Sequence, residues 1–294
     1  MLASAMQPIL LVDTYSLFFR AYHALPEMNT AAGEPTNALY GFCAVLLKEL
    51  RERKPAGLAF AVDAPKKTFR HERFSAYKAT RDAVPSPLVA QFGRLEGLLG
   101  AFEAPVFCVP GFEADDILAT LSHAFREEGA PVLVMSGDRD LLQLAHGCIE
   151  VLFLGARGQQ PTRYDEAAVR ERFGVGPREL PEYVALVGDA SDNLPGMAGV
   201  GPRTAAKWVA QFGSLEALLQ RANEVKPERL RAELQAGREQ LLLNRELATL
   251  RADVPLPAGP RSAPLGASAR ARLRALFVEL EFKSLLARLD ALEP

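Results

Sequence analysis

The sequence is poor in the residues that mark several classes of protein. It has only three cysteines, Cys43, Cys108 and Cys148, which lie far apart in apolar runs. They fit neither a disulfide framework nor a zinc site, so we expect buried, reduced thiols and a cytoplasmic protein. The chain also lacks an apolar run long enough to cross a bilayer, and Met1 to Gln7 lacks the basic start of a signal peptide. We therefore expect no membrane association.

Net charge is also small, at −2 for 294 residues, of which 49% are hydrophobic. This length suits one large α/β domain, or one domain with a small accessory domain, and an ample core. A low net charge does not exclude a nucleic-acid partner, because the total hides the distribution. If many acids gather in one metal-binding cluster, the rest of the chain is net positive.

Three short apolar runs lead into an aspartate: residues 8–12 precede Asp13, residues 58–62 precede Asp63, and residues 132–136 precede Asp138. Helical patterns lie between them, which predicts parallel strands of an α/β fold. Ligands of open α/β sheets bind beyond the carboxyl ends of the strands, so we expect the three aspartates to face one crevice. Any one of them alone could equally be a turn or helix-cap residue.

A further strand-like run, residues 105–109, leads into Gly111-Phe112-Glu113-Ala114-Asp115-Asp116 at the start of a helix. One acid would satisfy the free amides of a helix start, whereas three crowded acids repel one another. Such a cluster in a cleft needs cations, and carboxylate oxygens suit Mg²⁺ or Mn²⁺. The alternative is a solvated, acid-rich helix start.

Residues 66–82 form a basic segment with three interleaved aromatic residues, Phe69, Phe74 and Tyr77. Basic side chains neutralise phosphates and aromatic faces stack on unpaired bases, so the segment is a candidate contact for single-stranded nucleic acid. The alternative is an exposed helix with a few packed aromatic residues.

Beyond residue 154 the pattern becomes helical. A loop, Gly188–Gly196, carries Asp189 and Asp192, which could extend the acidic set. Gly196, Gly199 and Gly201 then precede a helix that carries Arg203 and Lys207. Glycines and free amides at a helix start can approach phosphate, although such turns are also common helix ends. The spacing excludes a nucleotide-binding P-loop.

Taken together, the motifs resemble those of the 5′-nuclease family, which includes the N-terminal nuclease domain of bacterial DNA polymerase I and the flap endonucleases. The resemblance covers about residues 8–292 and rests on five motifs: Val12-Asp13, Val62-Asp63, Gly111–Asp116, Asp138-Arg139-Asp140-Leu141 and Gly188–Gly196. It implies a PIN-like α/β fold with a mostly parallel sheet flanked by helices, a helical arch and a C-terminal helix-hairpin-helix subdomain. The domains expected are a nuclease core at 1–180, with the arch at about 66–90, and a helical DNA-binding subdomain at 181–294. In the second domain, the hairpin is expected at about 180–212 and the last helices are expected to pack on the core.

The resemblance also implies a role for each matching residue. One divalent ion would be held by Asp13, Asp63, Glu113 and Asp115, with Asp116 beside or between the two sites. A second would be held by Asp138, Asp140 and Asp189, with Asp192 in support. DNA would be contacted by Arg20, Arg70, Tyr77, Lys78 and Arg81, with Lys78 and Arg81 at the scissile phosphate, and by the hairpin glycines with Arg203 and Lys207. Hairpins of this family often enclose a potassium ion.

The implied activity is hydrolysis of DNA phosphodiesters by two divalent metal ions, as a 5′-3′ exonuclease and 5′-flap endonuclease of replication and repair. The partner would be DNA with a 5′ flap, a 5′ overhang or a single-strand/double-strand junction, recognised through its backbone by a monomer. A dehalogenase-type phosphatase also places Asp at strand ends, but it needs a second Asp where this chain has Tyr15. A junction-binding protein without turnover is the other alternative. A free-standing nuclease and one domain of a longer polymerase would share these motifs; the absence of polymerase sequence favours the former.

Overall fold

The computed structural model describes residues 6–155 and 160–292. Most of the N-terminal segment assessed for a signal peptide, Met1 to Gln7, therefore lies outside the described residues. Within the described ranges, no helix has the length and apolar content needed to cross a membrane.

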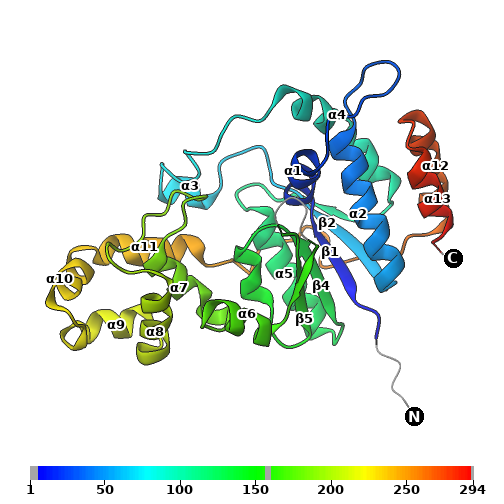
Figure 1. Ribbon diagram of the computed structural model, residues 1–294. Helices are drawn as coiled ribbons and strands as arrows, with labels where there is room; N and C mark the ends of the chain where they lie inside the picture. Colours follow the sequence, from blue (N-terminus) through cyan, green and yellow to red (C-terminus); the bar gives the residue numbers. More distant parts are fainter. Residues whose placement is uncertain (1–5, 156–159, 293–294) are drawn as a thin grey trace, which may run out of the picture.

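Six strands form one central sheet in the order β3-β2-β1-β4-β5-β6. Figure 1 labels four of them, β2, β1, β4 and β5, in the middle of the molecule. The first five are parallel and β6 is antiparallel to β5, which confirms the mostly parallel sheet. Their bounds are β1 Ile9–Asp13, β2 Gly57–Ala61, β3 Val106–Phe107, β4 Val132–Ser136, β5 Ile149–Phe153 and β6 Thr162–Tyr164. Strand β6 was not expected from the sequence, because only Tyr164 among its three residues is buried and no apolar pattern marks it.

Helices cover both faces of the sheet because its central strands are buried on both sides. Alternate residues of a strand point to opposite faces. Leu10 and Val12 accordingly pack in a cluster with α1, α2, α4, α12 and α13, whereas Ile9 and Leu11 pack in another with α5. The helices are α1 Thr14–Ala24, α2 Asn37–Arg53, α4 Ser86–Ala101, α5 Ala114–Glu127, α12 Ala267–Glu279 and α13 Lys283–Asp290. Of these, α1 was not anticipated from the sequence.

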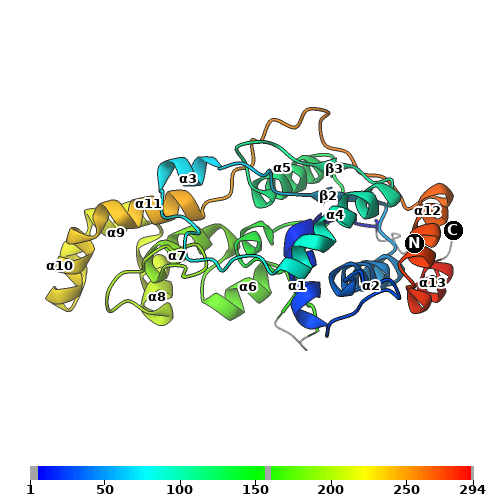
Figure 2. The ribbon, with the colours of Figure 1, turned by 90° about the horizontal axis from the view of Figure 1, so that it is seen from above.

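A helical region lies at one end of the sheet, opposite α12 and α13 (Figure 2). It contains α6 Glu166–Phe173, α7 Leu180–Val187, α8 Pro202–Phe212, α9 Leu215–Gln220, α10 Glu228–Ala236 and α11 Arg238–Ala248. Short 3-10 helices η2 (Pro177–Glu179) and η3 (Ala222–Glu224) connect some of them. The buried amide of Asn244 on α11 donates hydrogen bonds to the carbonyl oxygens of Ala185 (3.2 Å) and Pro195 (2.7 Å). One side chain therefore joins α11 to α7 and to the end of the acidic loop that follows it.

The segment expected to be a helical arch is mostly irregular. Only α3 (Phe69–Arg73) is helical before α4 begins, and turns occupy residues 75–80. Lys78 has a left-handed φ of 55°, which a helix excludes. The segment before α4, residues 66–85, is therefore an irregular strap with one short helix, which we call the arch strap.

Two of the three cysteines differ from expectation. Cys43 is buried, but Cys108 and Cys148 are exposed, and all three are free thiols. The apolar residues around Cys108 and Cys148 in the sequence belong to strand ends, where alternate side chains face solvent.

We predict that Gly196→Ala lowers the free energy of unfolding by about 1–3 kcal/mol. A Cβ at Gly196 would lie 2.0 Å from the carbonyl oxygen of Val187, so two backbone segments would have to separate. Gly201→Ala is the control, because a Cβ there meets no described atom within 4 Å. Urea unfolding of both variants measures the difference, and equal stability would show that the close approach is not required.

Candidate active site

Asp13 lies at the topological centre of the sheet. From β1 the chain runs outward to β2 and β3 and then returns to β4 on the other side, which opens a crevice beyond the ends of β1 and β4. Asp13 ends β1 and is only 4% exposed. Its Oδ1 accepts a hydrogen bond from the Ser16 amide (3.2 Å), which caps α1, and its Oδ2 accepts one from the Ser136 hydroxyl (2.6 Å).

Ser136 links the two strand ends. It is the last residue of β4, and its Oγ also accepts a hydrogen bond from the Asp138 amide at 2.9 Å. Asp138 in turn accepts one from the amide of Asp140 at 2.9 Å, where the 3-10 helix η1 (Asp140–Leu144) begins. The loop after β4 is thereby folded back so that Asp138 lies beside Asp13.

The N-terminus of α5 brings in the next acids. The Asp63 carboxylate, two residues beyond β2, accepts a hydrogen bond from the Ala114 amide at 2.8 Å. This fixes α5 against the end of β2. Glu113 caps the helix and Asp115 lies in its first turn, so both reach the same crevice.

Cationic and hydroxyl groups surround Glu113. Its Oε2 accepts a hydrogen bond from the Lys78 ammonium (2.9 Å) and from the Tyr77 hydroxyl (3.2 Å), and its Oε1 accepts one from the Thr68 hydroxyl (3.4 Å). All three donors come from the arch strap, which therefore lies directly over this carboxylate.

The loop after α7 supplies the last two acids. Asp189 accepts hydrogen bonds from the amide (2.7 Å) and hydroxyl (2.6 Å) of Ser191. Asp192 is 6% exposed, and its two oxygens accept from Tyr77 (2.7 Å) and Arg81 (2.9 Å). The strap therefore bridges the sheet edge and the helical region.

These elements enclose a cavity of about 340 Å³. It brings together four of the predicted carboxylates and three of the predicted cations: Asp13, Asp63, Asp115, Asp138, Arg20, Lys78 and Arg81. Tyr15 and Phe19 form part of its apolar wall. The other predicted acids lie close to the cavity. Glu113 and Asp192 interact with Lys78, and Asp140 interacts with Asp138, Asp189 and Asp192.

Burial and mutual repulsion change the acidities in this cavity. Burial, with the nearby charges of Asp63 and Asp138, raises the pKa of Asp13 to about 7. Burial and neighbouring carboxylates hold the pKa values of Asp115 and Asp140 well above the usual range. Burial alone would lower the pKa of Lys78, but Glu113 and Asp192 outweigh it and raise the pKa. The acids therefore resist carrying their full charge unless cations approach.

The donor set fits hard divalent ions, because the possible metal ligands that line the crevice are mainly carboxylate oxygens. Among the described residues, however, no three His, Cys, Asp or Glu side chains form a ready-made metal cage. The reason is visible in the contacts: several carboxylate oxygens accept hydrogen bonds from Lys78, Arg81, Ser136 and backbone amides. A metal ion at this edge would compete with these donors for the carboxylate oxygens.

Three predicted residues occupy places that do not match their expected roles. Arg70 is 2% exposed and pairs with Asp116, which is 0% exposed, at 2.6 and 2.8 Å. Neither side chain lines the cavity, and each uses on the other the groups that the predicted DNA contact of Arg70 and metal contact of Asp116 would need, so both roles stay predictions. Tyr77 is 3% exposed and its hydroxyl is bonded to two acids, which leaves no face for a base.

The predicted hairpin lies in the helical region, apart from the cavity. Gly201 caps α8, and Arg203 and Lys207 are exposed one turn apart on that helix. Gly199 has a left-handed φ of 79°, which explains the glycine there. Gly196 is explained by its close backbone neighbour, Val187.

Sequence reasoning missed the hydroxyl residues that orient the acids. Ser136 contacts Asp13 and the Asp138 amide, Ser16 accepts from the Gly137 amide at 2.8 Å, and Thr68 contacts Glu113. The available signal was position: Ser136 and Ser16 each lie within three residues of a strand-end aspartate.

A sheet edge with this concentration of buried carboxylate faced by lysine and arginine is typical of metal-dependent nucleases. Two family models match consecutive parts of the chain. "5′-3′ exonuclease, N-terminal resolvase-like domain" matches residues 8–174, and "5′-3′ exonuclease, C-terminal SAM fold" matches residues 175–271. The chain belongs to the 5′-3′ exonuclease family.

Curated relatives are DNA polymerases I. That of Mycobacterium tuberculosis (strain ATCC 25618 / H37Rv) is 42% identical over 283 residues, covering 96% of this chain and 31% of the relative. That of Bacillus caldotenax is 40% identical over 285 residues, covering 96% and 32%. The thermostable enzyme of Thermus thermophilus is 40% identical over 289 residues, covering 97% and 33%. The chain thus spans about a third of the length of these relatives.

Solved structures share the fold. T5 5′-exonuclease with bound zinc matches with a TM-score of 0.66 and 20% identity, covering 97% of this chain and 99% of that chain. The catalytic core of Rad2 in complex with DNA matches with a TM-score of 0.62 and 16% identity, covering 97% and 93%.

We predict that, without metal, the Asp13→Asn variant gains stability relative to wild type as the pH rises. An aspartate with a raised folded pKa favours folding below its unfolded value of 3.8, and this contribution is lost as pH rises to about 7. Asparagine carries no charge and can still accept from the Ser16 amide. The variant's free energy of unfolding, relative to wild type, should grow by about 4 kcal/mol over this window, since each pKa unit corresponds to about 1.4 kcal/mol.

Urea unfolding in EDTA across this pH range measures the effect. Asp165→Asn is the matched control, because Asp165 caps α6 from an exposed position. A stability difference for Asp13→Asn that stays constant with pH would contradict the raised pKa.

Proposed function

We propose that this chain is a structure-specific 5′-3′ exonuclease and 5′-flap endonuclease that hydrolyses DNA phosphodiesters. The observation that carries the proposal is the cavity at the sheet edge, where Asp13, Asp63, Asp115 and Asp138 face Lys78 and other cations. A phosphodiester is an anion whose hydrolysis gathers further negative charge, and this cavity supplies both the ligands for divalent ions and fixed positive groups.

The acids divide into two groups by position. Asp13, Asp63, Glu113 and Asp115 lie at the ends of β1 and β2 and the start of α5, and would hold one divalent ion. Asp138, Asp140 and Asp189 lie after β4 and α7 and would hold another, with Asp192 in support. Bound Mg²⁺ or Mn²⁺ supplies hydroxide from water at neutral pH and charge stabilisation for the attacking and leaving oxygens.

The arch strap supplies the phosphate-binding groups. Lys78 and Arg81 line the cavity and are held there by Glu113 and Asp192. Lys78 and Arg81 would donate to the scissile phosphate from this position and stabilise the developing negative charge. Arg20 on α1 faces the same cavity and would orient the phosphate from the other side.

The helical region would bind the duplex. The start of α8 offers free amides, with Arg203 and Lys207 exposed beside them, and such a terminus suits a backbone phosphate. A potassium ion in the preceding turn would strengthen this contact. A duplex held there and a strand end held at the cavity define a junction, so the substrates are 5′ flaps and 5′ overhangs, bound by a monomer. Removal of flaps and primers in replication and repair follows from this specificity.

The test is release of product from a 5′-labelled flap duplex with Mg²⁺. Wild type should cut near the junction, whereas Asp115→Ala and Lys78→Ala should lose about 100-fold or more in single-turnover rate. Both variants should still bind the flap, since most of the duplex contact lies on the helical region. Lys48→Ala on α2, outside the cavity lining, is the control.

Binding of the flap by wild type without release in Mg²⁺ or Mn²⁺ would overturn the enzyme and leave a junction-binding protein. Cutting of single-stranded and flap DNA at equal rates would overturn the junction specificity alone.

A further inference from the structure

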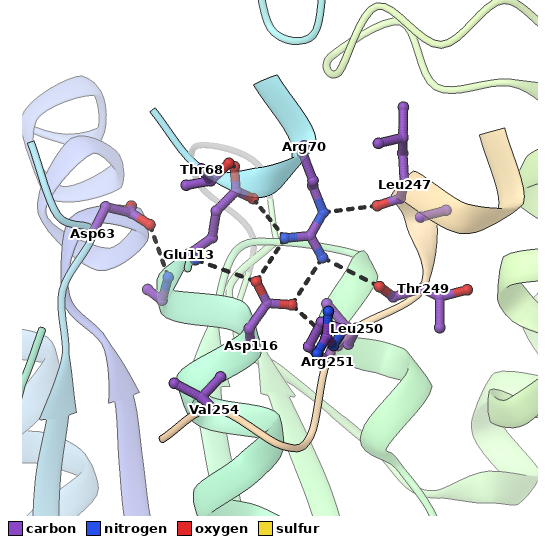
Figure 3. Close-up of polar contacts among 12 residues, drawn as sticks. Asp63, Thr68, Arg70, Glu113, Asp116, Leu247, Thr249, Leu250, Arg251 and Val254 are labelled. Atoms are coloured by element: carbon purple, nitrogen blue, oxygen red, sulfur yellow. Dashed lines mark hydrogen bonds and ion pairs between the residues drawn. The ribbon is translucent and has the colours of Figure 1, made fainter. Parts of the chain in front are cut away.

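Arg70 has no donor left for DNA. Its Nε donates to the Leu247 carbonyl (2.8 Å) and its Nη2 to the Thr249 carbonyl (3.2 Å). Nη1 and Nη2 both donate to Asp116, at 2.6 and 2.8 Å, and Nη1 lies 3.5 Å from Oε2 of Glu113. A guanidinium has five N–H groups, and here each one faces an acceptor. The side chain is therefore fully used in contacts within the protein (Figure 3).

Asp116 is equally saturated. Its Oδ1 accepts from Arg70 and from the Arg251 amide (2.9 Å), and its Oδ2 accepts from Arg70 and from the Glu113 amide (3.2 Å). A carboxylate has about four lone-pair sites, and all four are used. A metal ion at Asp116 would have to break this set.

The pair joins three segments that are distant in sequence. Arg70 comes from α3 in the arch strap, Asp116 from the first turn of α5, and the carbonyls from the end of α11 and the residues after it (Figure 3). Farther along α11, Asn244 holds the loop that ends in the DNA-binding hairpin. The loop is therefore linked to Glu113, next to the cavity, by the hydrogen bonds of Asn244, the last turn of α11, and the contacts of Arg70 and Asp116.

We propose that Arg70 and Asp116 are positioning residues, which transmit the placement of the helical DNA-binding region to Glu113 and the arch strap. The inference rests on the proposed nuclease function. Neither residue contacts metal or DNA. The rate of the chemical step depends on the planar guanidinium of Arg70, which pairs with both oxygens of Asp116. Burying an ion pair adds little stability compared with apolar packing, whereas a bidentate fork fixes distance and angle.

Two variants separate geometry from charge. Arg70→Lys keeps the positive charge but has its three N–H groups on one nitrogen, so it cannot reproduce the bidentate pairing with Asp116 together with the two carbonyl contacts. The paired variant Arg70→Gln/Asp116→Asn removes both charges and keeps hydrogen-bonding groups, so no unpaired charge is buried. We expect both to lower the single-turnover rate on a flap duplex by about 10- to 100-fold, with the dissociation constant for the flap unchanged.

Glu246→Gln is the matched control. Glu246 on α11 pairs with Arg73 on α3, so it joins the same two elements, but both side chains are exposed. An exposed ion pair contributes little, and we expect the control to retain the wild-type rate. Thermal melts of all variants, at an assay temperature well below each midpoint, keep unfolding out of the rates.

Two binding readouts do not depend on activity. The slope of log K against log salt for the flap should be the same in wild type and the paired variant; a lost phosphate contact would reduce its magnitude by about one. The rise in melting temperature caused by Mn²⁺ should persist in Asp116→Asn and shrink in its neighbour Asp115→Asn.

A reduced salt slope would overturn the inference by showing that Arg70 contacts DNA. Loss of the Mn²⁺ effect in Asp116→Asn would overturn it by showing a metal ligand. A wild-type rate in Arg70→Lys and the paired variant would overturn the positioning role. If wild type itself fails to cut, the nuclease proposal fails, and the two binding readouts still decide whether these residues contact DNA or metal.

Discussion

Repulsion among buried carboxylates at the carboxyl end of the sheet is the constraint on which the rest of the site depends. The parallel strands bring Asp13 and Asp138 to one edge, and α5 adds Asp115. Burial and mutual charge raise their pKa values, so this edge is costly without cations. The arch strap offsets part of the cost with Lys78 and Arg81. The same groups that balance the acids are therefore the ones placed to meet a phosphate.

The second requirement is that parts from distant segments hold their relative positions. Near the strand ends, hydrogen bonds to a single neighbouring side chain are enough to hold the acids, as where Ser136 links Asp13 to Asp138. The helical region is tied to the acids at two places: Asp192 accepts hydrogen bonds from Tyr77 and Arg81 of the arch strap, and Arg70 joins the end of α11 to Asp116. The buried ion pair thus couples the part that would hold duplex DNA to the part that would cut it.

The sheet and most of its acids could be predicted because their signals are local. An apolar run that ends in aspartate marks a strand end, and Asp13, Asp63, Asp115 and Asp138 do line one cavity. The roles of Arg70 and Asp116 could not, because their partners lie far away in sequence; Arg70 and Leu247 are 177 residues apart. Tyr77 was assigned to DNA from its basic surroundings, but its hydroxyl is held by two acids. The irregular strap was also missed, because tertiary contacts rather than helix propensity determine its path.

The most direct test of the account uses a flap duplex in which sulfur replaces a non-bridging oxygen of the scissile phosphate. Sulfur binds Mg²⁺ poorly and accepts Mn²⁺ more readily. If the carboxylates act by holding ions against this phosphate, one sulfur isomer should slow cleavage strongly in Mg²⁺, and Mn²⁺ should restore much of the rate. An equal effect of sulfur in both metals would show that no ion contacts the phosphate there and would contradict the account.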